Sequence, residues 1–379
     1  MKRYLSDYID SNVVGLYNNS QLSKDINQYN NLKLKYTFKE YPTQLSPRIY
    51  TSFNELDQDS NNSLDEDILK IIISPEHLHR SIEESNDKNN NNNNNNNDTT
   101  TTTSFNIEKY FQSLKTQLFG RDLMYSVKLT STQSLMMKYL EFTEQQGLVI
   151  TCDQQSGGRG RGQNKWESPI GCLLFSYKCK LTQGTLLPFL QYIAGIAMIR
   201  ALKDLPQTKQ LPEGTIQLKW PNDIYTKDGI KIGGILCQSN YFNSTFDVVI
   251  GIGINVANDE PTLSLNQLLR KHNIQSYITR DDLLSNYFNH FEKIYIQFLQ
   301  HGFKPFHSEY LSNWIHQNQV VLIKETNQYV KVVGLTDEGY LKAIECSSDG
   351  KVFDETKVHS LYPDGTSFDF KNSLILPKK

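Results

Sequence analysis

SGGRGRGQNKWESPIG, residues 156–171, places five glycines and two arginines between two apolar runs. Glycines leave backbone N–H groups open to an anion, and arginines donate charge-assisted hydrogen bonds to phosphate or carboxylate oxygens. A Walker A loop is not matched, because Trp166 follows Lys165 where Ser or Thr is required. The stretch is therefore an anion-binding loop, a short RNA-binding segment, or a surface loop with incidental arginines.

The segments around this loop predict alternating strands and helices. Strands are expected directly before and after it, at 147–152 and 170–179, because apolar residues dominate both. Apolar residues at helical spacing predict helices at 105–118, 131–146, 184–203, 281–300 and 303–315. Further strands are predicted at 67–74, 123–129, 214–220, 231–237 and 246–254. This order of elements predicts a mixed α/β (α+β) domain.

Both ends of the chain differ from this central domain, which we place at 105–315. Residues 316–379 contain short predicted strands that indicate a small closed β-barrel, at 320–325, 328–336, 339–346 and 351–362. An unbroken asparagine run and the threonines after it have no apolar side chains to bury. We therefore expect a disordered low-complexity linker at 87–104. Residues 1–86 form a short N-terminal extension of unknown role, with a further predicted strand at 32–41.

Composition restricts the class of protein. The formal net charge is −2, which disfavours a general binder of nucleic acid or anionic membranes. The five cysteines include no CxxC pair, the N-terminus has no apolar signal region, and no apolar run reaches membrane-spanning length. No basic recognition helix is predicted before the linker. We expect a cytoplasmic protein with no DNA and no membrane partner, and a mitochondrial fraction stays open.

The stretch LKWPNDIY, residues 218–225, places a lysine at the end of a predicted strand. Pro221 prevents simple continuation of that strand within a central ladder. A lysine at a strand end can hold a phosphoryl group as a compact point charge, although a solvated lysine beside a Pro-Asn turn fits the same pattern. Asn222 and Asp223 are expected to shape the turn that holds Lys219.

Two glycine-containing strands accompany this lysine. KIGGILCQ (231–238) has a glycine pair that indicates close approach of a ligand or of another strand. VVIGIGINV (248–256) has two more glycines, but no helix follows it as a dinucleotide-binding fold requires. Each stretch is a weak signal by itself. Together with the loop at 156–171 in one domain, they favour a site for an anionic ligand.

In this order and at these separations, GRGRGQNKWESPIG, KWPND, GGIL and GIGINV resemble the biotin–protein ligase (holocarboxylase synthetase) family, and the loop looks like its eukaryotic form. STQS, residues 131–134, matches an earlier biotin-contacting segment of that family. The resemblance covers roughly 105–365. It implies a catalytic domain of the class II synthetase-like, biotin–lipoate ligase type, followed by a small SH3-like β-barrel.

The resemblance further implies an ATP-dependent ligase. Such an enzyme joins the carboxylate of biotin to the α-phosphorus of ATP, which gives biotinyl-5′-AMP and pyrophosphate, with Mg²⁺ on the phosphates. It then transfers biotin to one lysine of a biotin acceptor domain of a carboxylase, the biotin carboxyl carrier domain. Lys219 and Arg161 are the expected catalytic residues, and Asp223 is a candidate for a metal contact.

The resemblance also implies which residues hold the two substrates. The expected biotin-binding residues are Ser131, Thr132, Gln155, Arg159, Gly160, Arg161, Lys219, Gly233 and Gly234. The expected residues for ATP and the adenylate are Arg159, Arg161, Trp166, Lys219 and Asn255. Trp166 could instead be a core anchor at the exit of the loop.

Two other functions stay open at this stage. A lipoate or octanoate ligase shares the general fold and the transfer of an acyl group to lysine, but enzymes of that type lack the GRGRG…W pattern. An RNA-binding protein could use the RG loop together with the barrel, and it would show a steep salt dependence of RNA affinity. Binding of biotin with ATP separates both from a biotin ligase.

Overall fold

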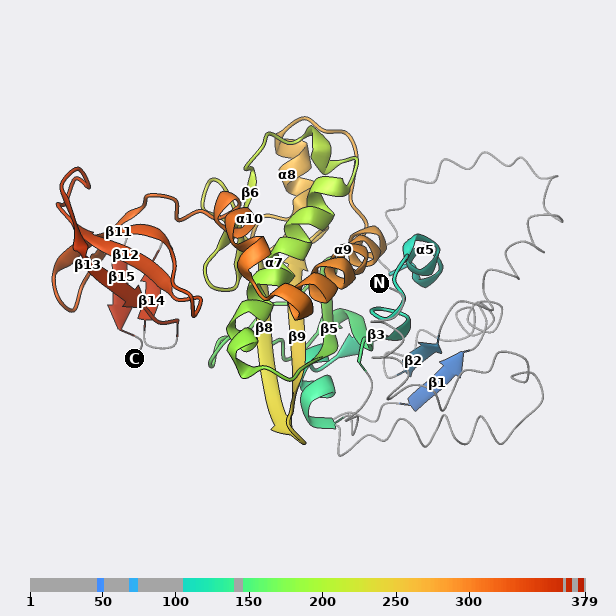
Figure 1. Ribbon diagram of the computed structural model, residues 1–379. Helices are drawn as coiled ribbons and strands as arrows, with labels where there is room; N and C mark the ends of the chain where they lie inside the picture. The colour runs from blue at the N-terminus through green and yellow to red at the C-terminus, as the bar shows by residue number, and fades with distance from the viewer. Residues whose placement is uncertain are drawn as a thin grey trace.

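The computed structural model describes residues 46–50, 68–73, 105–139, 146–363, 366–369 and 374–377. Two sheets organise this part of the chain, one of nine strands and one of six (Figure 1). The strand predicted at 32–41 and the linker predicted at 87–104 lie outside the described residues. A mixed α/β fold is confirmed.

The larger sheet runs in the order β1-β2-β3-β4-β5-β9-β8-β7-β6. Strands β3 and β4 are parallel, whereas β4–β5, β5–β9 and β8–β9 are antiparallel. Its strands are β1 (Ser46–Tyr50), β2 (Ile68–Ile73), β3 (Asp122–Leu129), β4 (Val149–Gln155), β5 (Cys172–Leu181), β6 (Ile216–Lys219), β7 (Asp223–Thr226), β8 (Lys231–Phe242) and β9 (Thr245–Asn255).

Strands β1 and β2 come from the predicted N-terminal extension but belong to the larger sheet. Strand β2 runs antiparallel to β3, with Lys70 opposite Tyr125 and Ile73 opposite Asp122. Strand β1 then pairs in parallel with β2. The extension therefore adds backbone pairing to the edge of the central domain, where an unpaired strand would otherwise present free N–H and C=O groups.

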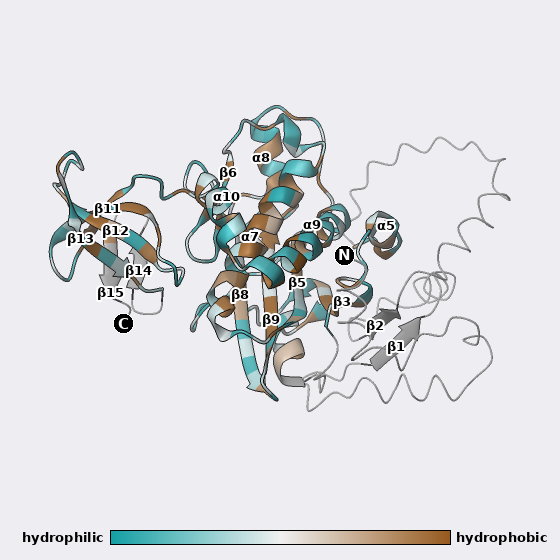
Figure 2. Cartoon of the chain, in the orientation of Figure 1, coloured by the Kyte–Doolittle hydropathy of each residue, from teal (hydrophilic) through white to brown (hydrophobic). Residues whose placement is uncertain are grey.

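Two long helices, α7 (Leu187–Asp204) and α9 (Arg280–His301), pack together over one face of this sheet (Figure 1). Figure 2 shows that α7 and the adjacent parts of β8 and β9 are largely hydrophobic. Contrary to the expectation that no apolar run reaches membrane-spanning length, residues 184–204 are long and apolar enough to span a membrane by composition, but 67% of that apolar window is buried inside the fold. A helix apolar on all sides and covered by other elements is a core helix.

Aromatic rings fill the contact between α9 and β5. The ring of Tyr177 lies 4.8 Å from Phe291 and 5.2 Å from Phe288, both in edge-to-face geometry. The buried hydroxyls of Tyr177 and Tyr287 satisfy each other at 2.6 Å. Edge-to-face pairs add roughly 0.5–1.5 kcal/mol each beyond the area they bury, so this cluster anchors α9 to the sheet behind the site.

Some predicted helices differ from their expected bounds, and for the first of them the cause lies far along the chain. Helix α5 covers Ile107–Ser113 and not 105–118. The buried Glu292 carboxylate accepts from the backbone N–H groups of Gln117, Leu118 and Phe119 at 2.8–3.0 Å, which replaces the last helical turn. Of the helix predicted at 131–146, the described residues up to 139 form α6 (Thr132–Ser134) and a π-helix, Leu135–Tyr139. The segment predicted at 303–315 divides into a 3₁₀ turn and α10 (His307–Ser312).

Helix α8 (Leu265–Lys271) was not predicted, although its start carries a recognisable signal. Ser264 accepts from the backbone of Gln267, while the Gln267 side chain accepts from the backbone N–H of Ser264. This is a capping box, which satisfies two of the N–H groups that a helix start leaves open. Strand β7 was also missed, because it is only four residues long and four residues separate its end from the start of β8.

The C-terminal sheet runs in the order β13-β12-β11-β10-β15-β14. The four predicted strands are present as β10 (Val320–Ile323), β11 (Gln328–Leu335), β12 (Leu341–Cys346) and β13 (Phe353–Leu361). Two further strands follow, β14 (Thr366–Asp369) and β15 (Leu374–Pro377). A small C-terminal sheet is thus present beside the α/β domain (Figure 1).

Candidate active site

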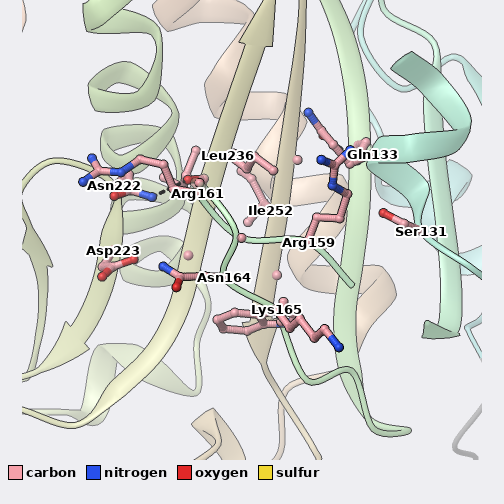
Figure 3. Close-up of a pocket in the computed structure, with 18 of the residues that line it drawn as sticks. Ser131, Gln133, Arg159, Arg161, Asn164, Lys165, Asn222, Asp223, Leu236 and Ile252 are labelled. Atoms are coloured by element: carbon pink, nitrogen blue, oxygen red, sulfur yellow. Dashed lines mark hydrogen bonds between the residues drawn. The ribbon is translucent and has the colours of Figure 1, made fainter. Parts of the chain in front are cut away.

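A cavity of about 700 Å³ opens over β8 and β9, under the loop that contains the quoted stretch. Gly234, Gly251 and Gly253 line it, because these strands carry no side chains at those positions. Figure 3 shows the loop crossing in front of both strands, with Arg159 extending towards Gln133 and Arg161 extending towards Asn222. A concave site of this size suits a small-molecule ligand.

The inner end of the cavity is a network of buried polar side chains. The backbone N–H of Thr132 donates to Oε1 of Gln155 at 2.7 Å, and the hydroxyls of Thr132 and Ser176 lie 2.9 Å apart. Ser176 in turn donates to Oε1 of Gln133 at 3.2 Å. Ser131 caps α6 by accepting from the N–H of Ser134. The predicted Ser131, Thr132 and Gln155 all line the cavity, and so do Gln133 and Ser176, which were not predicted.

The loop itself is an ordered turn. A bridge joins Arg159 to Lys165, and the N–H of Gly160 donates to the carbonyl of Asn164 at 2.8 Å. Gly162 stands in the tip with φ of +68°, a conformation that favours glycine over residues with a Cβ. The predicted Arg159, Gly160 and Arg161 line the cavity. The glycines therefore shape a turn that carries two cations over the cavity.

Lys219 ends β6 on the wall opposite the polar network. It stands opposite Asp223 in the β6–β7 hairpin, and its ammonium lies 5.0 Å from the ring centroid of Tyr225. Asn222 fixes the hairpin turn, because its Nδ2 donates to the carbonyl of Ile235 at 2.7 Å. The turn-shaping role predicted for Asn222 is confirmed, and Lys219, predicted to be catalytic, lines the cavity.

Trp166 forms part of the outer wall of the cavity. A Cβ at Gly253 would lie 2.6 Å from the indole Nε1, and a Cβ at Gly234 would lie 3.5 Å from the ring. The ammonium of Lys231 lies 5.6 Å from the ring centroid, within the range of a cation–π contact. The indole Nε1 is buried and has no hydrogen-bond partner among the described residues. Trp166 therefore presents a flat face at the cavity.

Gly233 and Asn255, both predicted to contact ligand, do not line the cavity. A Cβ at Gly233 would point at Ile224 and the carbonyl of Gly253, since successive residues of a strand face opposite sides of the sheet. Asn255 is buried behind the cavity floor, where its Nδ2 donates to Oγ1 of Thr262 at 2.7 Å. It holds the loop after β9 in place.

Positive charge dominates the lining. The basic residues at the cavity are Arg159, Arg161, Lys165, Lys219 and Lys231, and the acidic one is Asp223. Asp223 is itself paired with Lys231 at 2.7 Å. No group of three or more His, Cys, Asp or Glu side chains that could hold a metal occurs in the part of the chain that the structure describes. The basic side chains can therefore neutralise a polyanionic ligand. The Asp223 carboxylate offsets little of this charge, because it is already paired with Lys231.

Comparison with known proteins agrees with this geometry. Residues 123–255, from β3 to the end of β9, match the biotin/lipoate A/B protein ligase family. The chloroplastic biotin–protein ligase 1 of Arabidopsis thaliana is 37% identical over 73% of this chain and 74% of its own length. The biotin–protein ligase of Homo sapiens is 33% identical over 73% of this chain and 38% of its own length.

A solved structure shows the same fold. It is a point mutant of the biotin protein ligase from Aquifex aeolicus in complex with biotin, with a TM-score of 0.50 and 23% sequence identity. The match covers 63% of this chain and 94% of that one. The family match and the relatives together define an enzyme of the biotin/lipoate protein ligase class.

The plant relative narrows this class, because this chain covers three quarters of its length at well above 30% identity. The chain belongs to the biotin–protein ligase family. The resemblance inferred from the sequence is thereby confirmed, and the RNA-binding interpretation of the loop is not retained.

Proposed function

We propose that the cavity binds biotin and MgATP, forms biotinyl-5′-AMP, and transfers the biotinyl group to a lysine of a carboxylase acceptor domain. The observation that carries this proposal is the convergence of five cations on one cavity whose inner end is a buried polar network. The cations suit a carboxylate and a polyphosphate that must meet. The polar network suits a neutral, hydrogen-bonding head group such as the ureido ring of biotin.

In the first step, a carboxylate oxygen of biotin attacks the α-phosphorus of ATP. A new C–O–P bond forms, the bond from the α-phosphorus to the bridging oxygen breaks, and pyrophosphate leaves. The carboxylate is already a nucleophile, so no general base is required. Lys219, Arg159 and Arg161 reduce the repulsion between the two anions, and fixed cations in a partly dry site are effective because they need no reorganisation.

In the second step, the ε-amine of the acceptor lysine attacks the carbonyl carbon of the mixed anhydride. The amide C–N bond forms, the C–O bond to AMP breaks, and the proton that the amine loses passes to water. The indole of Trp166 offers a face for the adenine ring, and the Lys231–Asp223 pair lies at the same end of the cavity. A magnesium ion would be held by the ATP phosphates and would neutralise part of their charge, with Asp223 as the nearest acidic side chain of the cavity lining.

The remaining assignments follow from the same proposal. We propose a catalytic domain of the class II synthetase-like type at 105–315 and an SH3-like barrel at 316–379. The two strands from the extension pair with the catalytic sheet. We also propose a cytoplasmic location, biotin-dependent carboxylases as acceptors, and neither DNA nor membrane as a partner.

Transfer of labelled biotin to an isolated biotin acceptor domain tests the function. Lys219→Ala should lower the rate of adenylate formation by roughly 10²–10³, the usual cost of removing one group that stabilises developing charge. Lys209→Ala is the matched control, because Lys209 is an exposed lysine on the 3₁₀ turn Thr208–Gln210, outside the cavity. Full activity of Lys219→Ala would contradict the site assignment.

A lipoate ligase is the second candidate, because the matched family includes lipoate ligases. Biotin with ATP should raise the Tm more than lipoate with ATP, since a ligand that binds only the folded state stabilises it in proportion to its affinity. A larger shift with lipoate would favour the second candidate.

A further inference from the structure

The strand that carries Lys219 is held along its outer edge by the segment that enters the C-terminal sheet. Strand β6 is the last strand of the larger sheet. The N–H of Leu218 donates to the carbonyl of Asn313 at 2.7 Å, and the N–H of Ile315 donates to the carbonyl of Leu218 at 2.9 Å. A parallel bridge therefore joins Leu218 to Trp314. Backbone pairing ends there, one residue before Lys219.

A histidine side chain continues this pairing one step further. The backbone N–H of Trp220, the residue after Lys219, donates to Nε2 of His316 at 3.1 Å. Because that N–H can only donate, Nε2 must accept, and the ring proton stands on Nδ1. Nδ1 lies 3.0 Å from Oε1 of Gln319, which accepts it. Gln319 therefore sets the tautomer that His316 needs.

His316 is fully buried and stays neutral. Burial, together with the nearby charge of Lys219, lowers its pKa to about 4, although the hydrogen bond with Gln319 opposes this shift. A neutral imidazole keeps the lone pair on Nε2 that accepts from Trp220. Protonation would remove that lone pair and place a second cation beside Lys219.

The indole of Trp220 is held from the same side. Its Nε1 donates to the hydroxyl of Tyr192 at 2.9 Å and to the carbonyl of Gly339 at 3.3 Å. The Tyr192 hydroxyl also donates to Gly339, at 2.6 Å. Gly339 belongs to the turn between β11 and β12 of the C-terminal sheet. Both the backbone and the ring of Trp220 are therefore fixed by residues that follow the catalytic domain or form its core helix.

We propose that His316 is a positioning residue for adenylate formation, because it fixes the backbone at Trp220 and so holds Lys219 in the cavity. This inference rests on the proposed function. His316 has no place in the lining of the cavity, so it acts through the lining residues whose backbone it fixes, Trp220 and the adjacent Lys219. An error of about 1 Å in the placement of a reacting group can cost roughly 10²-fold in rate.

His316→Met and His316→Gln form a matched pair to test this. Both side chains have similar length and flexibility, but glutamine offers a carbonyl oxygen to the N–H of Trp220, whereas the methionine sulfur is only a weak acceptor. His290→Met is the control, since His290 is a half-buried histidine on α9 that contacts Asp204 and lies outside the cavity lining. The measurements are kcat for biotin-dependent pyrophosphate release, and the Kd values of biotin and of a non-hydrolysable biotinyl-adenylate analogue.

We expect His316→Met to lower kcat and to weaken analogue binding, each by roughly 10-fold or more. His316→Gln and His290→Met should stay within about threefold of the wild type, and the Kd of biotin alone should not change in any of them. A double-mutant cycle gives the decisive result. In a Lys219→Ala background, His316→Met should change the analogue Kd by less than about twofold, since the contact it acts through is already absent.

Three results would overturn the inference: unchanged kcat in His316→Met, equal defects in the glutamine and methionine variants, or an equal effect of His316→Met with and without Lys219. If His316→Met does not fold, Gln319→Met tests the same inference with the imidazole in place. A wild-type kcat and a wild-type analogue Kd in Gln319→Met would then contradict the inference. The proposed function fails separately, if the wild type releases no pyrophosphate with biotin. Unchanged analogue binding in Lys219→Ala would overturn the inference and the assignment of Lys219, but not the proposed function.

Discussion

The guanidinium of Arg161 donates from Nη2 to the carbonyl oxygen of Pro363 at 2.8 Å, which joins the glycine-rich loop to the segment after β13. The two residues are 202 positions apart in the chain. A cation proposed to hold the adenylate is thus anchored by the C-terminal part of the protein. This hydrogen bond links the loop over the cavity to the C-terminal part of the chain.

Arg161→Ala should release the adenylate faster. Loss of a charge-assisted hydrogen bond costs about 1.5–3 kcal/mol, so the dissociation rate of labelled biotinyl-5′-AMP should rise by roughly 10- to 100-fold. Stopped-flow chase with unlabelled analogue measures this rate. Arg270→Ala, at an exposed position on α8, should leave it unchanged, and an unchanged rate in Arg161→Ala would remove Arg161 from the site.

Gly251 and Gly253 line different ends of the cavity, Gly251 beside Gln133 of the polar network and Gly253 beside Trp166. A Cβ at Gly251 would collide with Oε1 of Gln133, whereas one at Gly253 would lie 2.6 Å from Nε1 of Trp166. Gly251→Ala should therefore raise KM for biotin by about 10-fold or more, and Gly253→Ala should do so for ATP, each because a wall residue must move into the cavity.

Steady-state pyrophosphate release at varied biotin and varied ATP distinguishes the two glycine variants. Gly334→Ala in β11 is the matched control, since a Cβ there meets nothing nearer than 3.9 Å. An equal rise of both KM values in both variants would mean that the cavity is not divided in this way.

The sequence predicted the parts of the site that local chemistry marks, namely the RG loop, the lysine at the end of β6 and the STQS segment. It missed Ser176, because a serine inside the apolar strand β5 gives no sign of which face it occupies. Lys231 was missed for a similar reason, since a lysine at the start of a strand has many roles. Strand alternation places Gly233 on the face opposite Gly234, which explains why only Gly234 of this pair lines the cavity.

Long-range contacts account for the errors in the fold. The end of α5 depends on the carboxylate of Glu292, more than 170 positions later in the chain. The pairing of β2 with β3 joins segments on either side of a low-complexity run. Neither contact changes the local hydrophobic periodicity of the sequence. Helix lengths and strand partners could therefore not be predicted, although most helices and strands were assigned the correct type.

Asp153 and Arg280 form a buried ion pair at 2.8 Å, and the Tyr125 hydroxyl donates to the same carboxylate at 2.7 Å. Removing one partner of a buried pair leaves the other charge uncompensated, which costs about 3–5 kcal/mol. Asp153→Ala should lower the free energy of unfolding by that amount. Urea unfolding followed by tryptophan fluorescence measures it, with the largely exposed Asp204→Ala as control. A loss of under about 1 kcal/mol would show that the Arg280 charge is solvated.

Stability should fall in mildly acid solution because of His316. Its pKa is about 4 in the folded protein, below the ordinary value of 6.5. Between these two values the unfolded chain binds a proton that the folded protein does not, so stability is fully present above pH 6.5 and is lost as the pH falls towards 4. From pH 7 to pH 5 this one group should cost roughly 2 kcal/mol.

Comparison with His316→Gln isolates this contribution. Glutamine does not titrate, and the half-buried His290, whose pKa is also lowered, contributes equally to both proteins and cancels. Urea unfolding of wild type and variant at pH 7 and pH 5 gives the difference, and the wild type should lose the greater stability by roughly 2 kcal/mol. Equal losses would mean that the imidazole gains its proton in the folded state as easily as in water. The hydrogen bond from Trp220 could not then be what occupies Nε2.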